Sequence, residues 1–198
     1  MIPGIDVSHY QGVIDWQRVK AAGIQFAYLK ATQGASFVDP RVFANYTGAK
    51  AAGIPIGLYH VFNASAGLDA QLNNWQKARR LYASTLPAWL DVEPGSFTED
   101  SVPQIVELLK NGFSFRDMVY CSPSTGDDLY AGDVEEFSFY GLAVAHYGVS
   151  EPRLPKPWTS WEFWQHSQSG SVDGIAGPVD LDWFNGDEQS LLNLTKAT

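Results

Sequence analysis

Short apolar runs rich in β-branched and aromatic residues alternate with longer amphipathic segments along much of the chain. Such alternation is typical of strands and helices that follow one another in an α/β domain. Eight runs predict strands: Ile2–Val7, Ile24–Lys30, Ile54–Phe62, Ala88–Glu93, Met118–Ser122, Gly141–Tyr147, Glu162–Ser167 and Val179–Phe184. Four longer segments predict helices, at residues 15–23, 40–53, 68–84 and 102–111.

The ends of the first two predicted helices carry clear signals. Asp15 is a typical N-cap residue, and Asp39-Pro40 places a proline at the first helical position. The four residues Ala21-Ala22-Gly23-Ile24 recur as Ala51-Ala52-Gly53-Ile54, and each glycine suits the left-handed turn that ends a helix. This repeat predicts two successive strand–helix units of a parallel sheet.

The last third of the chain differs from this pattern. Residues 124–138 have room for one short helix, whereas residues 148–160 contain three prolines and residues 168–178 are rich in Gly and Ser. The fold class is therefore predicted as α/β, an irregular TIM-like barrel with about five strand–helix units followed by three strands without helical crossovers. Without those crossovers, some of the late strands are expected to pair antiparallel. No linker interrupts the chain, so we expect a single barrel domain over residues 1–198.

The composition excludes several classes of partner and structure, but it does not by itself assign a function. The 198 residues include one cysteine, Cys121, so no intrachain disulfide is possible. The net charge of −9 argues against nucleic acid and against anionic membranes as partners. Aromatic residues make up 14% of the chain, which suits either a protein that stacks sugars or a well-filled core.

Carboxylates gather at the predicted strand ends, where barrels of this class place their active sites. Asp6 ends the first strand, Asp91 and Glu93 end the fourth, and Asp180 lies in the eighth, which closes the barrel beside the first. Glycoside hydrolysis needs one proton donor and further carboxylates beside a cationic transition state. We expect one acid of the close pair Asp91 and Glu93 to have a raised pKa and to act as the acid, and the longer Glu93 reaches further. The alternative for any single aspartate is that it caps a following helix.

Other chemistries have weaker support. His9, His60, His146 and His166 show no metal-binding spacing, and no nucleotide-binding glycine motif occurs, so neither a metal nor a cofactor is expected. His60 follows Tyr59 near a strand end and could line the site or be a buried structural histidine. Trp158 and Trp161 could form a sugar platform or a hydrophobic plug on the irregular side of the barrel.

Five segments resemble the lysozymes of glycoside hydrolase family 25, in the same order and nearly end to end. They are Gly4–Gly12 (GIDVSHYQG), Leu29–Gly34 (LKATQG), Gly57–His60 (GLYH), Leu90–Glu93 (LDVE) and Trp164–Asp182, which begins WQHS and ends GIAGPVDLD. The resemblance implies a barrel of five strand–helix units plus three strands. It also implies cleavage of the β-1,4 bond between N-acetylmuramic acid and N-acetylglucosamine in peptidoglycan.

By the same resemblance, Glu93 is the proton donor and Asp91 its partner acid, with Asp6 and Asp180 as supporting carboxylates. Five further residues are expected to bind the substrate: Tyr59, Tyr120, Trp164, His60 and Asp182. The expected partner is the glycan strand of bacterial peptidoglycan, and the chain is expected to be a monomer.

This chain departs from the family pattern in two places. Gln33 stands where a glutamate is common, and a tryptophan common before the sixth strand's Ala145-His146-Tyr147 is absent. The resemblance leaves two other functions open: a chitinase-like glycosidase acting on another acetamido sugar, and a non-catalytic wall-binding barrel that would require lost carboxylates. An enzyme that degrades the cell wall but begins without a signal peptide is expected to be a phage endolysin held in the host cytoplasm before release, or a chain whose export signal has been removed.

Overall fold

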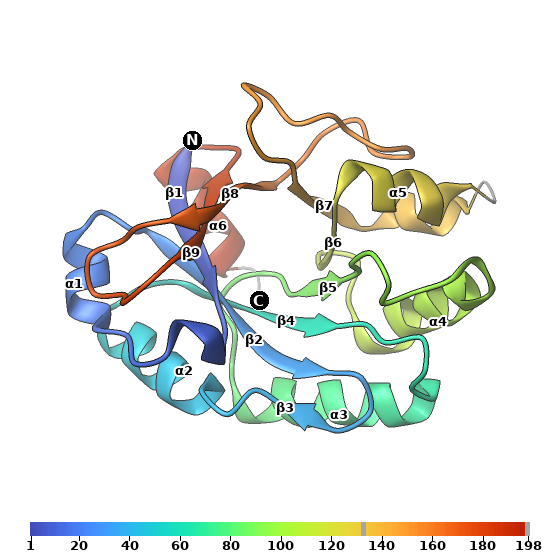
Figure 1. Ribbon diagram of the computed structural model, residues 1–198, viewed down its shortest axis with the longest axis horizontal. Coiled ribbons are helices and arrows are strands. Elements are labelled where there is room, and N and C mark those ends of the chain that lie inside the picture. The colour runs from blue at the N-terminus through green and yellow to red at the C-terminus, as the bar shows by residue number, and fades with distance from the viewer. Residues whose placement is uncertain (132–133, 197–198) are drawn as a thin grey trace.

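The structure is a computed structural model that describes residues 1–131 and 134–196. Its centre is a sheet that closes on itself in the order β1-β9-β8-β7-β6-β5-β4-β2, because β1 also pairs with β2 (Figure 1). The eight barrel strands are β1 (Ile2–Val7), β2 (Phe26–Gln33), β4 (Ile56–Val61), β5 (Trp89–Asp91), β6 (Met118–Cys121), β7 (Gly141–Ala145), β8 (Phe163–Gly170) and β9 (Val179–Phe184). The irregular TIM-like α/β barrel predicted from the sequence is therefore confirmed.

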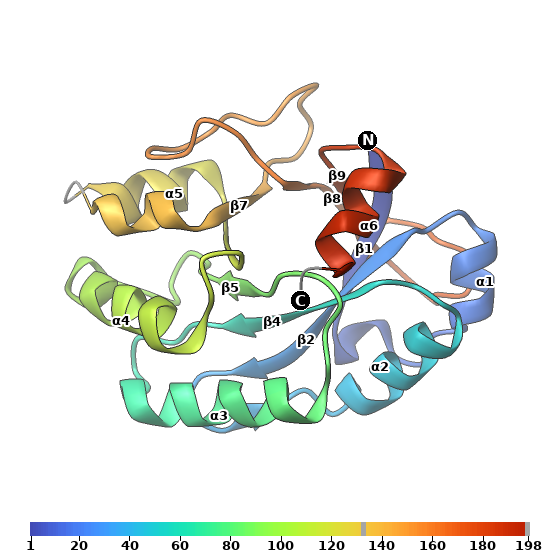
Figure 2. The same ribbon diagram turned by 180° about the vertical axis from the view of Figure 1, so that it is seen from behind.

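Five strand–helix units come first, as predicted. Helices α1 to α5 follow β1, β2, β4, β5 and β6 and lie outside the barrel (Figures 1 and 2). The helices are α1 (Trp16–Ala21), α2 (Val42–Ala51), α3 (Leu68–Leu81), α4 (Val102–Gly112), α5 (Pro123–Tyr130) and α6 (Glu188–Lys196), and three short 3-10 helices span His9–Gln11, Glu99–Ser101 and Glu135–Phe139. None of the helices in the described ranges is long and apolar enough to span a membrane.

The late strands pair differently from the early ones. β7 and β8 are parallel although the chain between them forms no helix, since residues 146–162 are long enough to return to the same end. β9 is antiparallel to both β8 and β1. The expected antiparallel pairing is thus found for β9, and it brings the beginning of this strand, rather than its end, to the rim where β1 ends.

The helix signals are confirmed at three of four positions. The Asp15 carboxylate accepts hydrogen bonds from the first-turn amides of α1, and Gly23 and Gly53 have φ values of +93° and +68° after α1 and α2. The prediction that Pro40 opens α2 is wrong. Asp39 accepts a hydrogen bond from the Arg41 backbone amide at 2.9 Å, which places Pro40 in a turn before the helix begins.

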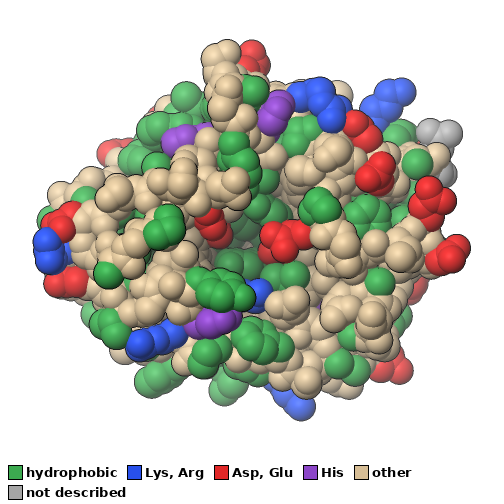
Figure 3. Space-filling model, viewed as in Figure 1, with side chains coloured by type: hydrophobic (Ala, Val, Ile, Leu, Met, Phe, Trp, Pro, Cys, Tyr) green, Lys and Arg blue, Asp and Glu red, His purple; other side chains and the backbone are tan. Residues whose placement is uncertain are grey.

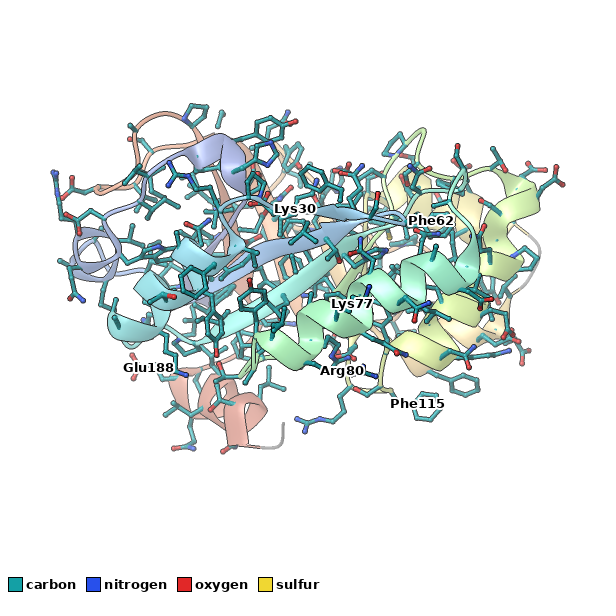
Figure 4. All side chains as sticks on the ribbon, turned by 90° about the horizontal axis from the view of Figure 1, so that it is seen from below. Lys30, Phe62, Lys77, Arg80, Phe115 and Glu188 are labelled. Atoms are coloured by element: carbon teal, nitrogen blue, oxygen red, sulfur yellow. The ribbon has the colours of Figure 1, made fainter. Side chains whose placement is uncertain are left out.

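Besides the 3-10 helices, a short strand and a final helix were not predicted from the sequence. A two-residue strand, β3 (Phe37–Val38), forms a hairpin with β2, and α6 follows the last barrel strand. Leu191 of α6 packs into the cluster that fills the barrel interior. Figure 4 shows α6, marked by Glu188, on the side of the barrel opposite Lys30, so this helix closes the barrel end away from the pocket described below.

The core has an inner and an outer layer because successive residues of a strand face opposite sides. The inner layer fills the barrel with large rings: Tyr28 stacks on Trp89 with ring centroids 3.5 Å apart, and Phe163 meets both rings edge-on. The outer layer joins the barrel to its helices. The inner rings fill the middle of the barrel. The polar residues of the strands lie beyond these rings, at the barrel end that contains the pocket.

Candidate active site

A pocket of about 190 Å³ lies at this end of the barrel, and Figure 3 shows acidic side chains on either side of the hollow. Four carboxylates line it, from Asp6, Asp91, Glu93 and Asp180. Aromatic rings complete the wall, from Tyr10, Tyr59, Trp89 and Tyr120, and Lys30 is the cation among the lining residues. The sequence therefore predicted all four carboxylates that meet here.

Asp6 and Asp180 meet because β1 and β9 close the barrel side by side. The two residues are directly opposite each other in this antiparallel pair. The chain after Asp6 is fixed by a short capped turn: Ser8 accepts from the Tyr10 amide, and Gln11 accepts from the Ser8 amide at 2.9 Å. That turn sets Tyr10 beside the carboxylates with 80% of the residue exposed.

Asp91 and Glu93 reach the pocket from β5 and the loop after it. The strand ends at Asp91, which is 6% exposed, while Glu93 is exposed. The Glu93 position is set by a tight turn, in which the Ser96 amide donates to the Glu93 carbonyl at 3.0 Å and Gly95 has a φ of +81°. The sequence placed Glu93 within the strand, but the structure gives it an accessible position just beyond the strand end.

The two members of this close pair have different environments. Burial raises the pKa of Asp91 well above its ordinary value, and the neighbouring charge of Glu93 raises it further, while Lys30 acts in the opposite direction. The Asp91 Oδ1 atom is buried and has no hydrogen-bond partner among the described residues. The raised pKa that the sequence analysis expected of the acid itself is found instead at Asp91, because Asp91 is the buried member of the pair, while Glu93 is the accessible member.

Asp6, Asp180 and Asp182 form a second acidic group along β1 and β9. Burial is the main cause of a raised pKa in all three, and Asp180 has a pKa of about 6. Asp182 is 1% exposed and neither of its carboxylate oxygens has a partner in the described ranges, whereas Asp6 accepts a hydrogen bond from Gln165. Burying a carboxylate without a partner disfavours its ionised form at Asp182, whereas the hydrogen bond from Gln165 favours the ionised form of Asp6.

The predicted substrate-binding residues separate by the face of the strand on which they lie. Tyr59 and Tyr120 line the pocket. His60 faces outward, bonds Thr32 through Nδ1 at 2.7 Å and has a pKa of about 4 because it is buried. Trp164 also faces outward, since its neighbour Phe163 points into the barrel, and its indole N–H donates to the His146 carbonyl at 2.7 Å. Asp182 lies below the pocket rather than in its wall.

The remaining tryptophans of the late segment pack rather than line the pocket. Trp158, Trp161 and Trp183 are partly buried against the outer core layer, and the Trp158 indole donates to the Tyr140 carbonyl at 2.9 Å. Trp161 meets Trp164 edge-on. Of the two interpretations of Trp158 and Trp161, this packing supports the hydrophobic plug.

The residues missed from the sequence include Trp89 of the pocket wall and three residues with polar side chains, Tyr10, Lys30 and Gln165. Each of these three lies within a segment quoted for the family resemblance, and strand alternation could have found two of them. Lys30 follows the inward residues Phe26 and Tyr28 at even spacing, and Gln165 follows inward Phe163. Tyr10 lies in a 3-10 turn, where no such alternation exists.

A second hollow on the surface does not form a competing site, and the described residues form no metal site. A hollow of about 740 Å³ lies between α1 and residues 173–176, where Arg18 pairs with Asp173 on the exposed surface. Of the described residues that line it, the carboxylates are Asp15, which caps α1, and Asp173, which pairs with Arg18. Across residues 1–131 and 134–196, no three His, Cys, Asp or Glu side chains are placed to hold a metal ion.

Comparison with known proteins gives consistent matches over nearly the whole chain. The family described as "Glycosyl hydrolases family 25" matches residues 5–175. The chain is 38% identical to "Lysozyme M1" of Streptomyces globisporus, covering 100% of this chain and 72% of that protein, and 30% identical to the "Autolytic lysozyme" of Clostridium acetobutylicum, covering 92% and 55%. The crystal structure of a bacterial lysozyme from Streptomyces coelicolor superimposes with a TM-score of 0.86 at 34% identity, covering 100% and 98% of the two chains.

Proposed function

The chain belongs to glycosyl hydrolase family 25 and is a lysozyme of the N-acetylmuramidase type, and from this premise we propose how its pocket cleaves peptidoglycan. The scissile bond is the β-1,4 bond between N-acetylmuramic acid and N-acetylglucosamine. One observation carries the proposal: four carboxylates from three parts of the chain line one pocket, and Glu93 among them is exposed. Glycoside hydrolysis requires such a set of acids around one bond.

Glu93 is the proton donor in this mechanism. It stands on a fixed turn at the pocket rim, where its carboxyl can protonate the glycosidic oxygen as the bond to the leaving sugar breaks. The buried partner Asp91 orients the substrate's acetamido group or stabilises the developing positive charge. Since Asp91 is held on the last residue of a strand, it moves little as the charge develops.

Asp6 and Asp180 stabilise the same cationic transition state from the opposite wall. Their strands are hydrogen-bonded to each other, so the two carboxylates keep a constant relationship. Tyr59 and Tyr120 supply ring faces next to these acids, which suits the apolar faces of a pyranose ring. His60, Trp164 and Asp182 support the wall without lining it.

The test is mass spectrometry of purified peptidoglycan digested by the wild type and by Glu93→Gln. Fragments with reducing N-acetylmuramic acid from the wild type, absent with the variant, are the expected result. Reducing N-acetylglucosamine instead would change the assigned bond, and full activity of the variant would remove Glu93 as the acid. Chitin oligosaccharides serve as the second substrate, because they contain the acetamido group but no muramic acid.

Two finer expectations belong to the same proposal. A phage endolysin remains a prediction from the sequence, tested by finding a lysis-protein gene beside the gene for this chain. The monomer prediction is tested by light scattering, which should give a mass near 21.8 kDa.

A further inference from the structure

Gln165 lies beneath the acidic pocket, is 4% exposed, and is not among the described residues that line it. Its Nε2 group donates to Asp6 Oδ2 at 2.5 Å. Its Oε1 atom accepts from the Tyr120 hydroxyl at 2.8 Å and also from the Tyr147 hydroxyl. One buried amide therefore joins a carboxylate of the site to two phenols from neighbouring parts of the barrel.

The two phenols fix the direction of this amide. Burial raises the pKa of Tyr120, and it raises the pKa of Tyr147 to about 12, so both groups keep their protons at neutral pH and donate them. An amide has its acceptor on one side and its donors on the other. With the two O–H donors against its oxygen, the amide of Gln165 presents its N–H group to Asp6. The reverse orientation would set a carbonyl oxygen against a carboxylate.

Asp6 needs such a donor because it lies among other acids. Its pKa is raised by burial and then by Asp182 and Asp180, and the hydrogen bond from Gln165 is the interaction that opposes these effects. A lysine or arginine could also stabilise Asp6, but it would cancel negative charge that the cationic transition state requires. The neutral Gln165 amide hydrogen-bonds the Asp6 carboxylate without cancelling its negative charge.

We propose that Gln165 is a positioning residue for the reaction: its amide, locked by Tyr120 and Tyr147, holds one oxygen of Asp6 and leaves the other for the substrate. This inference rests on the role of Asp6 in the proposed function. It assigns a part in catalysis to a side chain that does not itself touch the sugar.

The shape-matched variant Gln165→Glu tests the inference through its pH profile. A protonated glutamic acid can still accept from both phenols and donate its O–H to Asp6, whereas an ionised one repels Asp6 and has no proton to give. The titratable and charged groups that face this pair or line the pocket above it are Tyr59, Tyr120, Tyr147, Lys30, Asp91, Glu93, Asp180 and Asp182. The variant should therefore work in acid and fail as its new carboxyl ionises.

Initial rates of reducing-end release from purified peptidoglycan should be measured for both proteins from about pH 4 to pH 8. We expect Gln165→Glu to be within about tenfold of the wild type at the acid end and at least about 100-fold slower at neutral pH. The matched control is Gln189→Glu, which makes the same charge change on an exposed face of α6 and should follow the wild-type profile. A constant ratio between Gln165→Glu and wild type, in a pH range where carbon-13 NMR shows that the introduced carboxyl ionises, would show a merely structural role and overturn the proposal.

A second measurement does not depend on activity. Carbon-13 NMR of labelled aspartate carboxyls should show the titration midpoint of Asp6 about one pH unit higher in Gln165→Leu than in the wild type. An unchanged midpoint overturns the positioning role even if the rates fall. If the wild type releases no reducing ends but the midpoint moves as expected, the proposed function fails while the hold of Gln165 on Asp6 is established.

Discussion

Asp6 and Asp180 are direct cross-strand partners, although they lie 174 positions apart in the chain. The pairing exists because β9 runs antiparallel to β1, so the beginning of one strand lies beside the end of the other. The eight-strand barrel thus gathers acids at one rim from strands of opposite direction. This closure brings Asp6 and Asp180 together on the wall that faces Asp91 and Glu93.

Glu93→Gln is expected to lower turnover by about 10²–10⁴-fold, because the amide keeps the shape of the side chain but cannot act as an acid. Glu93 is exposed, so the substitution should leave the unfolding midpoint in urea unchanged within error. Reducing-end release and urea unfolding, measured on the same preparation, check both statements.

The control for this experiment is Glu99→Gln, which removes an exposed glutamate from a short 3-10 helix outside the pocket. It should retain wild-type turnover. An equal loss in both variants would mean that the effect comes from net charge on a polyanionic substrate, and not from a lost proton donor.

Asp91→Asn should lower turnover by about 10²–10³-fold, the usual loss when one preorganised electrostatic group is removed. Asn keeps the side-chain volume, so the inner rings Tyr28 and Trp89 stay in place. The expected change is in kcat more than in KM, since the carboxylate acts on charge that develops in the transition state. A variant with altered KM and normal kcat would instead assign Asp91 to ground-state binding.

The sequence predicted the barrel well because its early units follow local rules. Helix caps at Asp15, Gly23 and Gly53 and the repeated Ala-Ala-Gly-Ile joint depend on neighbouring residues only. Pro40 was misplaced because its turn is set by Asp39, whose carboxylate also bonds His9 from a distant part of the chain. A long-range contact of this kind leaves no local signal.

The carboxylates were predicted for the same reason, since strand ends can be located from apolar runs. The residues of the pocket wall were predicted less well, because a strand residue lines the pocket only if its side chain points into the barrel. His60 and Trp164 each stand one position away from an inward residue, so the pleat turns them outward. Gln165 and Lys30 face the site by the same alternation and were overlooked.

The activity of the enzyme should depend on the ionisation of Asp180, whose pKa is raised to about 6 by burial and by the charge of Glu93. Above pH 6 this group is ionised and can stabilise a cationic transition state, and below pH 6 it becomes neutral. The wild-type profile of kcat/KM should therefore decline in acid with a midpoint near pH 6. Asp180→Asn should be slower at neutral pH and should lack this decline, and a variant that retains the decline would assign it to another group.

Asp182→Asn should stabilise the folded protein, increasingly so as the pH rises. The pKa of Asp182 is raised in the folded state, first by burial and then by Asp180, so the folded chain binds more protons than the unfolded chain. By linkage, the free energy of unfolding then falls as the pH rises from the ordinary aspartate value toward the raised one. Each pH unit in that window removes about 1.4 kcal/mol for a single group. Asparagine has no proton to lose and escapes this penalty, so urea unfolding should show wild type and variant nearly equal near pH 4 and the variant more stable at pH 7. A constant difference at both pH values would mean that the Asp182 carboxyl is ionised inside the barrel and stabilised there by another group.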